Sequence, residues 1–198
     1  MVCNILINNF IRNNCRFIFK RIKIRQLSVD KEIKKIIFTG PESTGKSTLA
    51  KKLSQLYNTV WVPEFARTYL EGMNRLYREE DLLKIAQGQH DLESFFLKRT
   101  NKYLFCDTSM LVMKIWSEYR FGKCHPWILE QLENEKNASY VLCGTDISWE
   151  NDELRENPND RDELYQKYLS ELKFYQKEFI EVSGSQNDRI AKVEIFIN

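Results

Sequence analysis

The sequence is poor in the residues that mark the more specialised classes of protein. Its 198 residues include 7 glycines, 4 prolines and 2 histidines, while 42% are hydrophobic. This composition excludes collagen-like and wholly disordered chains. The five cysteines include no CxxC pair, so the sequence indicates neither a disulfide framework nor a zinc knuckle, and a reducing compartment fits best. At this length we expect one catalytic domain.

Long hydrophobic runs are also missing. Asn4, Asn8, Asn9 and Arg12 interrupt the most apolar part of the N-terminal segment, so no run approaches the length of a membrane span. In a secretory signal the basic residues precede the apolar stretch, and here the order is reversed. The sequence therefore predicts a cytoplasmic protein without a membrane span.

Positive charge is concentrated at the N-terminus. Residues 1–30 contain six of the 30 basic residues and one of the 28 acidic residues. This segment therefore has a net charge of +5, and the rest of the chain has a net charge of −3. A slightly acidic body argues against a nucleic-acid partner. We expect residues 1–33 to be a basic, disordered extension and residues 34–198 to be the folded domain. An Arg-rich organellar presequence is the alternative interpretation of the extension.

Short apolar runs alternate with segments of helical periodicity from residue 34 onward. The runs predict five strands, at residues 34–40, 59–62, 103–106, 139–143 and 179–182. Apolar residues at helical spacing predict helices at 46–57, within 64–100 with a break near Gly72, at 110–119 and from Leu164 to Tyr175. Trp116, Tyr168 and other aromatics on these helical stripes are expected in the core. Helices between the strands predict an α/β fold, with a parallel sheet of about five strands covered on both faces.

One segment fits the complete phosphate-binding pattern GxxxxGK[ST] and lies between a predicted strand and a predicted helix. Its residues are Gly40, Pro41, Glu42, Ser43, Thr44, Gly45, Lys46 and Ser47, followed by Thr48. In such a loop the backbone N–H groups surround the phosphates of ATP, the lysine reaches the β and γ phosphates, and the hydroxyl binds Mg²⁺. The segment predicts a P-loop NTPase that binds ATP and Mg²⁺.

Two carboxylates and an arginine follow other predicted strands, at the edge of the sheet where ligands bind. Asp107 ends the third strand, where P-loop proteins place the carboxylate that binds Mg²⁺ or its water. Thr108 follows it, so the Asp-Glu pair of motor ATPases is missing. Glu64 follows the second strand and Arg67 lies one helical turn later, which suits a hydroxyl base or ribose ligand beside a phosphate-binding arginine.

The structural alternatives for these residues are a helix cap for Asp107 and an exposed ion pair at a helix start for Glu64 and Arg67. Between Glu64 and Asp107, the roles of base and metal ligand stay open.

The polar segment 146–161 lacks periodicity and predicts a mobile lid loop near the phosphates. It contains Trp149, Arg155 and Arg161. Arginines on a lid can close over a triphosphate and stabilise the transferring group, and a tryptophan can stack on a base. Surface charge and a half-buried anchor are the alternatives for these side chains.

Five segments together resemble the ribosylnicotinamide kinase domain of NadR-type proteins. They are GPESTGKSTLA at 40–50, PEFARTYLE at 63–71, CDTS at 106–109, TDISW at 145–149 and VSGSQNDR at 182–189. The resemblance covers residues 34–198. It implies a nucleoside-kinase-like fold and transfer of phosphate from ATP to nicotinamide riboside, which gives ADP and nicotinamide mononucleotide in NAD biosynthesis.

The resemblance also implies roles for individual residues. Glu64 and Asp107 would flank the ribose 5′-hydroxyl, Trp149 would lie beside the nicotinamide ring, and Arg155 and Arg161 would belong to the lid. The chain departs from the family at Ser109, where Asp is frequent, and at residues 152–154, where Asp-Gly often precedes the lid arginine. Two alternatives stay open: a kinase of another small nucleoside or vitamin alcohol, and a non-catalytic ATP-binding regulatory module. The sequence leaves the oligomeric state open.

Overall fold

Five strands form one parallel sheet in the order β2-β3-β1-β4-β5 in the computed structural model, which describes residues 33–100, 102–150 and 159–198. The strands are β1 (Lys34–Thr39), β2 (Trp61–Val62), β3 (Tyr103–Asp107), β4 (Ala138–Cys143) and β5 (Glu178–Val182). The segment preceding Lys34 lies outside the described residues except for Ile33, so the structure does not test the predicted extension.

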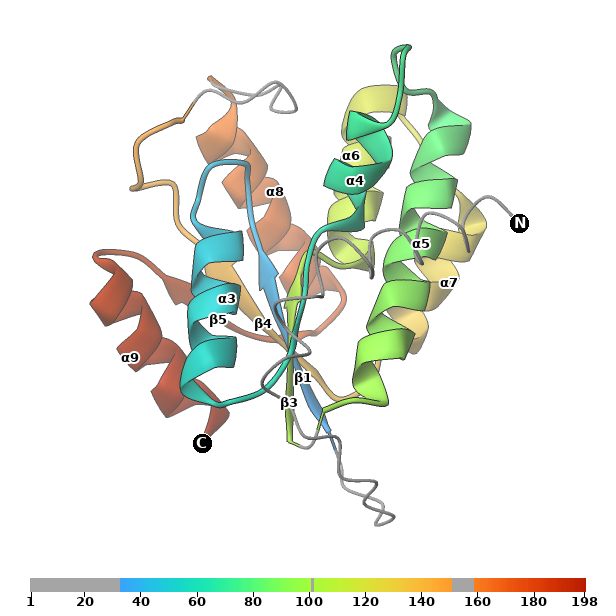
Figure 1. The fold of residues 1–198 in the computed structure, drawn as a ribbon. Helices are drawn as coiled ribbons and strands as arrows, with labels where there is room; N and C mark the ends of the chain where they lie inside the picture. The colour runs from blue at the N-terminus through green and yellow to red at the C-terminus, as the bar shows by residue number, and fades with distance from the viewer. Residues whose placement is uncertain (1–32, 101, 151–158) are drawn as a thin grey trace.

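Seven helices of the described ranges cover the two faces of the sheet. They are α3 (Lys46–Leu56), α4 (Phe65–Glu71), α5 (Glu79–Leu97), α6 (Met110–Phe121), α7 (Pro126–Asn134), α8 (Arg161–Phe174) and α9 (Gln186–Ile197). Helices α3 and α9 pack on one face, and the other five gather on the opposite face (Figure 1). None of these helices combines the length and apolar character that a bilayer span requires.

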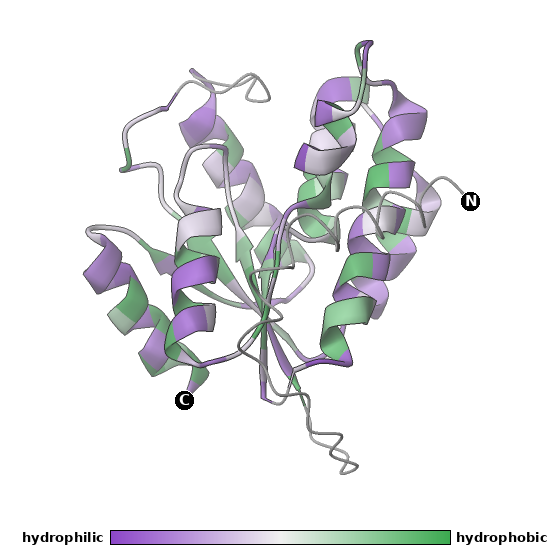
Figure 2. Cartoon of the chain, viewed as in Figure 1, coloured by the Kyte–Doolittle hydropathy of each residue, from purple (hydrophilic) through white to green (hydrophobic). Residues whose placement is uncertain are grey.

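The central strand is buried on both faces, which explains its uninterrupted apolar run. Ile36 and Phe38 face α3 and α9, whereas Ile37 faces the larger group of helices, and all three are fully buried. Figure 2 shows the same arrangement, with hydrophobic strands between helices that are hydrophilic on their outer sides. The sheet therefore carries two hydrophobic cores, one on each face.

The predicted α/β architecture is confirmed, with differences at particular elements. Strand β2 is shorter than predicted, and the break near Gly72 extends to Arg78 before α5 begins. Two helices were not predicted. Helix α7 begins with Pro126, and His125 accepts a hydrogen bond from the Trp127 N–H at its start. Helix α9 begins with a capping box in which the Ser185 and Asp188 side chains satisfy each other's backbone N–H groups.

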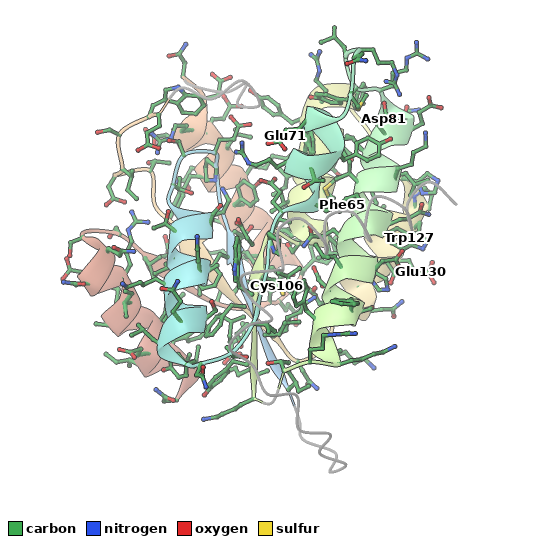
Figure 3. The ribbon with its side chains drawn as sticks, in the orientation of Figure 1. Phe65, Glu71, Asp81, Cys106, Trp127 and Glu130 are labelled. Atoms are coloured by element: carbon green, nitrogen blue, oxygen red, sulfur yellow. The ribbon has the colours of Figure 1, made fainter. Side chains whose placement is uncertain are left out.

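The start of α4 is held against α5 by a close contact. A Cβ atom at Gly88 of α5 would lie 2.1 Å from Cε1 of the buried Phe65, so only glycine permits this approach. The carboxamide of Gln89 accepts a hydrogen bond of 2.8 Å from the Phe65 N–H. In Figure 3 the labelled Phe65 lies where α4 approaches α5. These contacts fix the position of the residue that precedes α4, Glu64.

We expect Gly88→Ala to lower the free energy of unfolding by about 1–3 kcal/mol, because the added methyl group overpacks the Phe65 ring. Alanine's higher helix propensity, worth about 1 kcal/mol, opposes this loss only in part. Urea denaturation measures the change. Gly72→Ala is the matched control, since a Cβ there would meet nothing closer than the Tyr69 carbonyl oxygen at 3.7 Å. Equal stability of the Gly88→Ala variant and the unmodified protein would contradict the interpretation.

Candidate functional site

The loop between β1 and α3 turns sharply over the end of the sheet. Gly40 has φ of 127° and Gly45 has φ of 78°, a region of backbone conformation that favours glycine. A Cβ atom at Gly40 would lie 2.9 Å from the Cys143 carbonyl oxygen of β4. The two glycines therefore let the loop approach β4 and enter α3 directly, as the phosphate-binding pattern predicts.

The side chains of this loop are held by its own carbonyl groups. The Lys46 ammonium donates hydrogen bonds to the carbonyl oxygens of Gly40, at 2.9 Å, and Pro41, at 2.5 Å. The Thr44 hydroxyl donates to the same Pro41 carbonyl at 2.8 Å. Lys46 thus lies across the loop, where it can reach phosphate oxygens that the loop's N–H groups surround.

A hydroxyl and a carboxylate meet at the start of α3. Ser47 lies in its first turn, near the buried Asp107 at the end of β3, and its hydroxyl favours the charged form of that carboxylate. The next residue, Thr108, has φ of 94°, a strained conformation for a β-branched side chain. Oxygen ligands of this kind suit Mg²⁺, which proteins bind through one or two carboxylates together with substrate phosphates. The described residues hold no cluster of three or more His, Cys, Asp or Glu side chains fit for a metal.

A second carboxylate, Glu64, follows β2. Burial and the neighbouring charge of Asp107 raise the pKa of Glu64 to about 7, although Lys46 and Arg67 oppose the shift. Burial also raises the pKa of Asp107, and its hydrogen bond with Ser47 opposes that rise. The two carboxylates titrate as a pair, and Glu64 has the pKa that suits a general base near neutral pH.

A cavity of about 410 Å³ lies beyond the carboxyl ends of the strands, and it is lined by Ser47 and Glu64 but not by Asp107. The P-loop residues 40–48 line it with Glu64 and Arg67. Helix α6 contributes Val112, Ile115, Trp116 and Tyr119, and α8 contributes Leu164 and Tyr168. The predicted phosphate-binding loop therefore shares one cavity with the carboxylate of Glu64 and a largely apolar, aromatic surface.

The three residues predicted to belong to a lid differ in where they lie in the structure. Arg161 is the first residue of α8, so the polar segment predicted at 146–161 ends one residue earlier, and the lid role of Arg161 stays a prediction. Its guanidinium donates to the carbonyls of Ser43, at 3.0 Å, and Ile147, at 2.8 Å. Arg155 lies outside the described residues. Trp149 is half-buried beside Arg161, whose guanidinium lies 6.0 Å from the ring centroid, and it does not line the described cavity.

One functional residue was not predicted at all. Arg189 of α9 is buried, and its guanidinium donates to the Thr44 carbonyl at 2.9 Å, the Gly184 carbonyl at 3.1 Å and the Asp146 carboxylate at 2.6 Å. The Gly184 N–H also donates to Asp146, at 2.7 Å. Burial raises the pKa of Asp146, but these hydrogen bonds and the Arg189 charge outweigh that effect and lower it. The Arg189–Asp146 pair thus joins the loops that follow β1, β4 and β5.

Trp116 and Tyr168 were expected in the core, and both line the cavity. Tyr168 is almost fully buried and belongs to the hydrophobic core as expected, and it also contributes to the cavity wall. The apolar spacing of α6 and α8 identifies their inward faces correctly. It does not distinguish a face that meets the core from one that meets a cavity.

Comparison with known proteins agrees with the fold and with the resemblance noted from the sequence. The family model described as "AAA domain" matches residues 35–189. The chain is 29% identical over 162 residues to the trifunctional NAD biosynthesis/regulator protein NadR of Salmonella typhimurium, and 28% identical to that of Escherichia coli. Each alignment covers 79% of this chain and 40% of the relative, so the chain spans about two fifths of the length of these curated relatives.

Solved structures show the same architecture. A NadR protein in complex with NR has a TM-score of 0.72 at 19% identity, over 83% of this chain and 52% of that one. Thymidylate kinase from Ehrlichia chaffeensis has a TM-score of 0.61 at 15% identity, over 83% of this chain and 98% of that one.

The coupling between the two carboxylates can be measured directly. We expect Glu64 to titrate near pH 7 in ¹³C-carboxyl NMR, and Asp107→Asn to lower that pKa because a neighbouring negative charge is removed. Asp188→Asn, an exposed change in α9, is the control and should leave the Glu64 titration unchanged. A Glu64 pKa that is the same with and without the Asp107 charge would show that the two groups do not interact.

Proposed function

The chain belongs to the AAA domain family, and from this premise we propose that it is an ATP-dependent kinase that phosphorylates the 5′-hydroxyl of nicotinamide riboside. The observation that carries the proposal is the single cavity shared by the P-loop, Glu64 and an aromatic surface. Its apolar, aromatic wall beside the P-loop suits an acceptor with a flat ring, which a simple ATPase does not need. The similarity to NadR, and the NadR structure in complex with NR, support the choice of acceptor.

The proposed reaction is a direct in-line transfer. Glu64 accepts the proton of the 5′-hydroxyl while its oxygen forms a bond to the γ-phosphorus of ATP. The bond from that phosphorus to the bridging oxygen of the β-phosphate breaks, and the products are ADP and nicotinamide mononucleotide. The Lys46 ammonium and the loop N–H groups hold the phosphates and stabilise the charge that develops on them.

Ser47 and Asp107 are proposed to hold Mg²⁺, because a hydroxyl and a carboxylate, both oxygen donors, lie close together where the phosphate loop enters α3. Held by these two residues, Mg²⁺ would neutralise charge on the phosphate oxygens. We therefore propose Glu64 as the base, the choice that the sequence alone leaves open.

The remaining arginines complete the proposed site. Arg67, which lines the cavity, is placed to bind a phosphate or the ribose. Arg161 is a positioning residue for the P-loop through the Ser43 carbonyl. Arg155 and Trp149 stay predictions from the family resemblance. We also propose residues 34–198 as the kinase unit, and the family match at 35–189 supports this boundary.

Purified protein with Mg-ATP should release ADP only when an acceptor is present, and nicotinamide riboside should be the best acceptor in a panel with other nucleosides and thiamine. Lys46→Ala should lower turnover by a factor on the order of 10² or more without loss of thermal stability. Lys52→Ala, an exposed change on the same helix, is the matched control. ADP release without an acceptor would favour a regulatory ATPase module, and preference for another nucleoside would replace the proposed substrate.

The kcat/KM for nicotinamide riboside should rise with pH through about 7, because only the carboxylate form of Glu64 can accept the proton. Glu64→Gln should slow transfer by a factor on the order of 10² and remove this pH dependence. In contrast, the defect of Asp107→Asn should be relieved in part by excess Mg²⁺. If raised Mg²⁺ rescues Glu64→Gln instead, the two roles are reversed.

A further inference from the structure

We propose that Trp116 is the surface on which the flat base of the acceptor nucleoside stacks, and that Tyr77 is the positioning residue that holds the indole for this contact. The inference rests on the proposed kinase function and deepens it, because it identifies the residue that recognises the acceptor's base.

Trp116 lies in the same cavity as the proposed chemistry. It shares one face of α6 with Val112, Ile115 and Tyr119, and this face lines the cavity together with Glu64. Glu64 is assigned to the ribose 5′-hydroxyl, and the base is attached to the same ribose ring. A base attached to that ribose would therefore occupy the same cavity, of which this face of α6 forms one wall.

The indole of Trp116 is fixed by a neighbouring aromatic side chain. Its Nε1–H donates a hydrogen bond of 3.0 Å to the Tyr77 hydroxyl, and the two rings lie 5.1 Å apart between centroids at 65°. Tyr77 in turn packs edge-on against Phe121, with centroids 6.1 Å apart. Because the indole's one donor is already used, Trp116 offers a ligand its ring surface and no hydrogen bond.

The chemistry of such a surface selects flat rings. An aromatic ring in a half-buried wall stacks on planar heterocycles, and it attracts a cationic ring such as a pyridinium more strongly than a neutral one. All four tryptophans lie in the described residues, and Trp116 is the one that lines the cavity. Trp149, which the family resemblance places beside the ring, instead lies beside Arg161.

Steady-state kinetics on the full chain separate the two tryptophans. We expect Trp116→Ala to raise the KM for nicotinamide riboside by a factor on the order of 10 to 100, the effect of a lost stacking contact, with little change in the KM for ATP. Trp116→Phe should recover part of the loss. Tyr77→Phe should raise the same KM by a smaller factor, because it removes the hydrogen bond and keeps the ring.

Trp149→Ala tests the competing assignment, and Trp127→Ala is the matched control. Trp127 is a half-buried tryptophan of α7 that packs edge-on against His90 and does not line the cavity, and its loss should leave the riboside KM unchanged. A large KM increase in Trp149→Ala with none in Trp116→Ala would overturn the proposal and support the residue that the family resemblance indicates. An unchanged KM in both variants would overturn it as well.

Quenching of tryptophan fluorescence by nicotinamide riboside tests the contact without turnover. The riboside should quench the unmodified protein and the Trp149→Phe variant, and should lose most of this effect in Trp116→Phe. Quenching through Trp116 without phosphorylation would reject the proposed activity but keep the base contact. Phosphorylation with quenching that is insensitive to Trp116 would reject the contact but keep the activity, and the absence of both would reject both proposals.

Discussion

The pairing of β1 between β3 and β4 is the constraint on which the site depends. Phe38 lies opposite Asp107 on one side and Val141 on the other, so the three strands end at nearly the same level. The loop after β1 therefore begins beside the carboxylate that ends β3. Since Ile36, Ile37 and Phe38 of β1 are fully buried, this register is held by two hydrophobic cores rather than by the polar groups of the site. Nucleotide binding can thus rely on a frame that is formed independently of any ligand.

Burial in this frame raises the pKa of both carboxylates beside the phosphate loop. Glu64 and Asp107 lie in low-dielectric surroundings near each other, and both carboxylates are harder to ionise than in water. Lys46 and Arg67 offset this effect without cancelling it. The hydrogen bond of Asp107 with Ser47 distinguishes the two acids, because it favours the charged form of one and not of the other. Two similar residues thereby acquire the different properties that a metal ligand and a base require.

Local sequence patterns were sufficient to predict most of the strands and helices and the strand–loop–helix conformation of the P-loop. Gly40, Gly45, Lys46 and Ser47 are adjacent in the chain, and their pattern has one structural solution between a strand and a helix. The contacts of Arg189 could not be predicted in this way, because it lies 145 residues from Thr44 and the contact exists only after α9 packs on the sheet. The position of Trp116 in the cavity wall was not predicted for another reason. Helical periodicity identifies an apolar face, but it does not tell whether a ligand or another side chain covers that face.

The Arg189–Asp146 pair makes the last helix part of the phosphate site rather than an accessory to the sheet. One buried guanidinium on α9 holds the Thr44 carbonyl and, through Asp146 and Gly184, the loops after β4 and β5. The side chains of Arg189 and Asp146 are therefore linked: an exchange of either one removes its hydrogen bonds to the backbone of these loops. The constraint also applies to protein engineering. A fusion partner attached beyond Asn198 leaves this support in place, whereas trimming into α9 removes it along with the hydrophobic contacts of Val193 and Ile197.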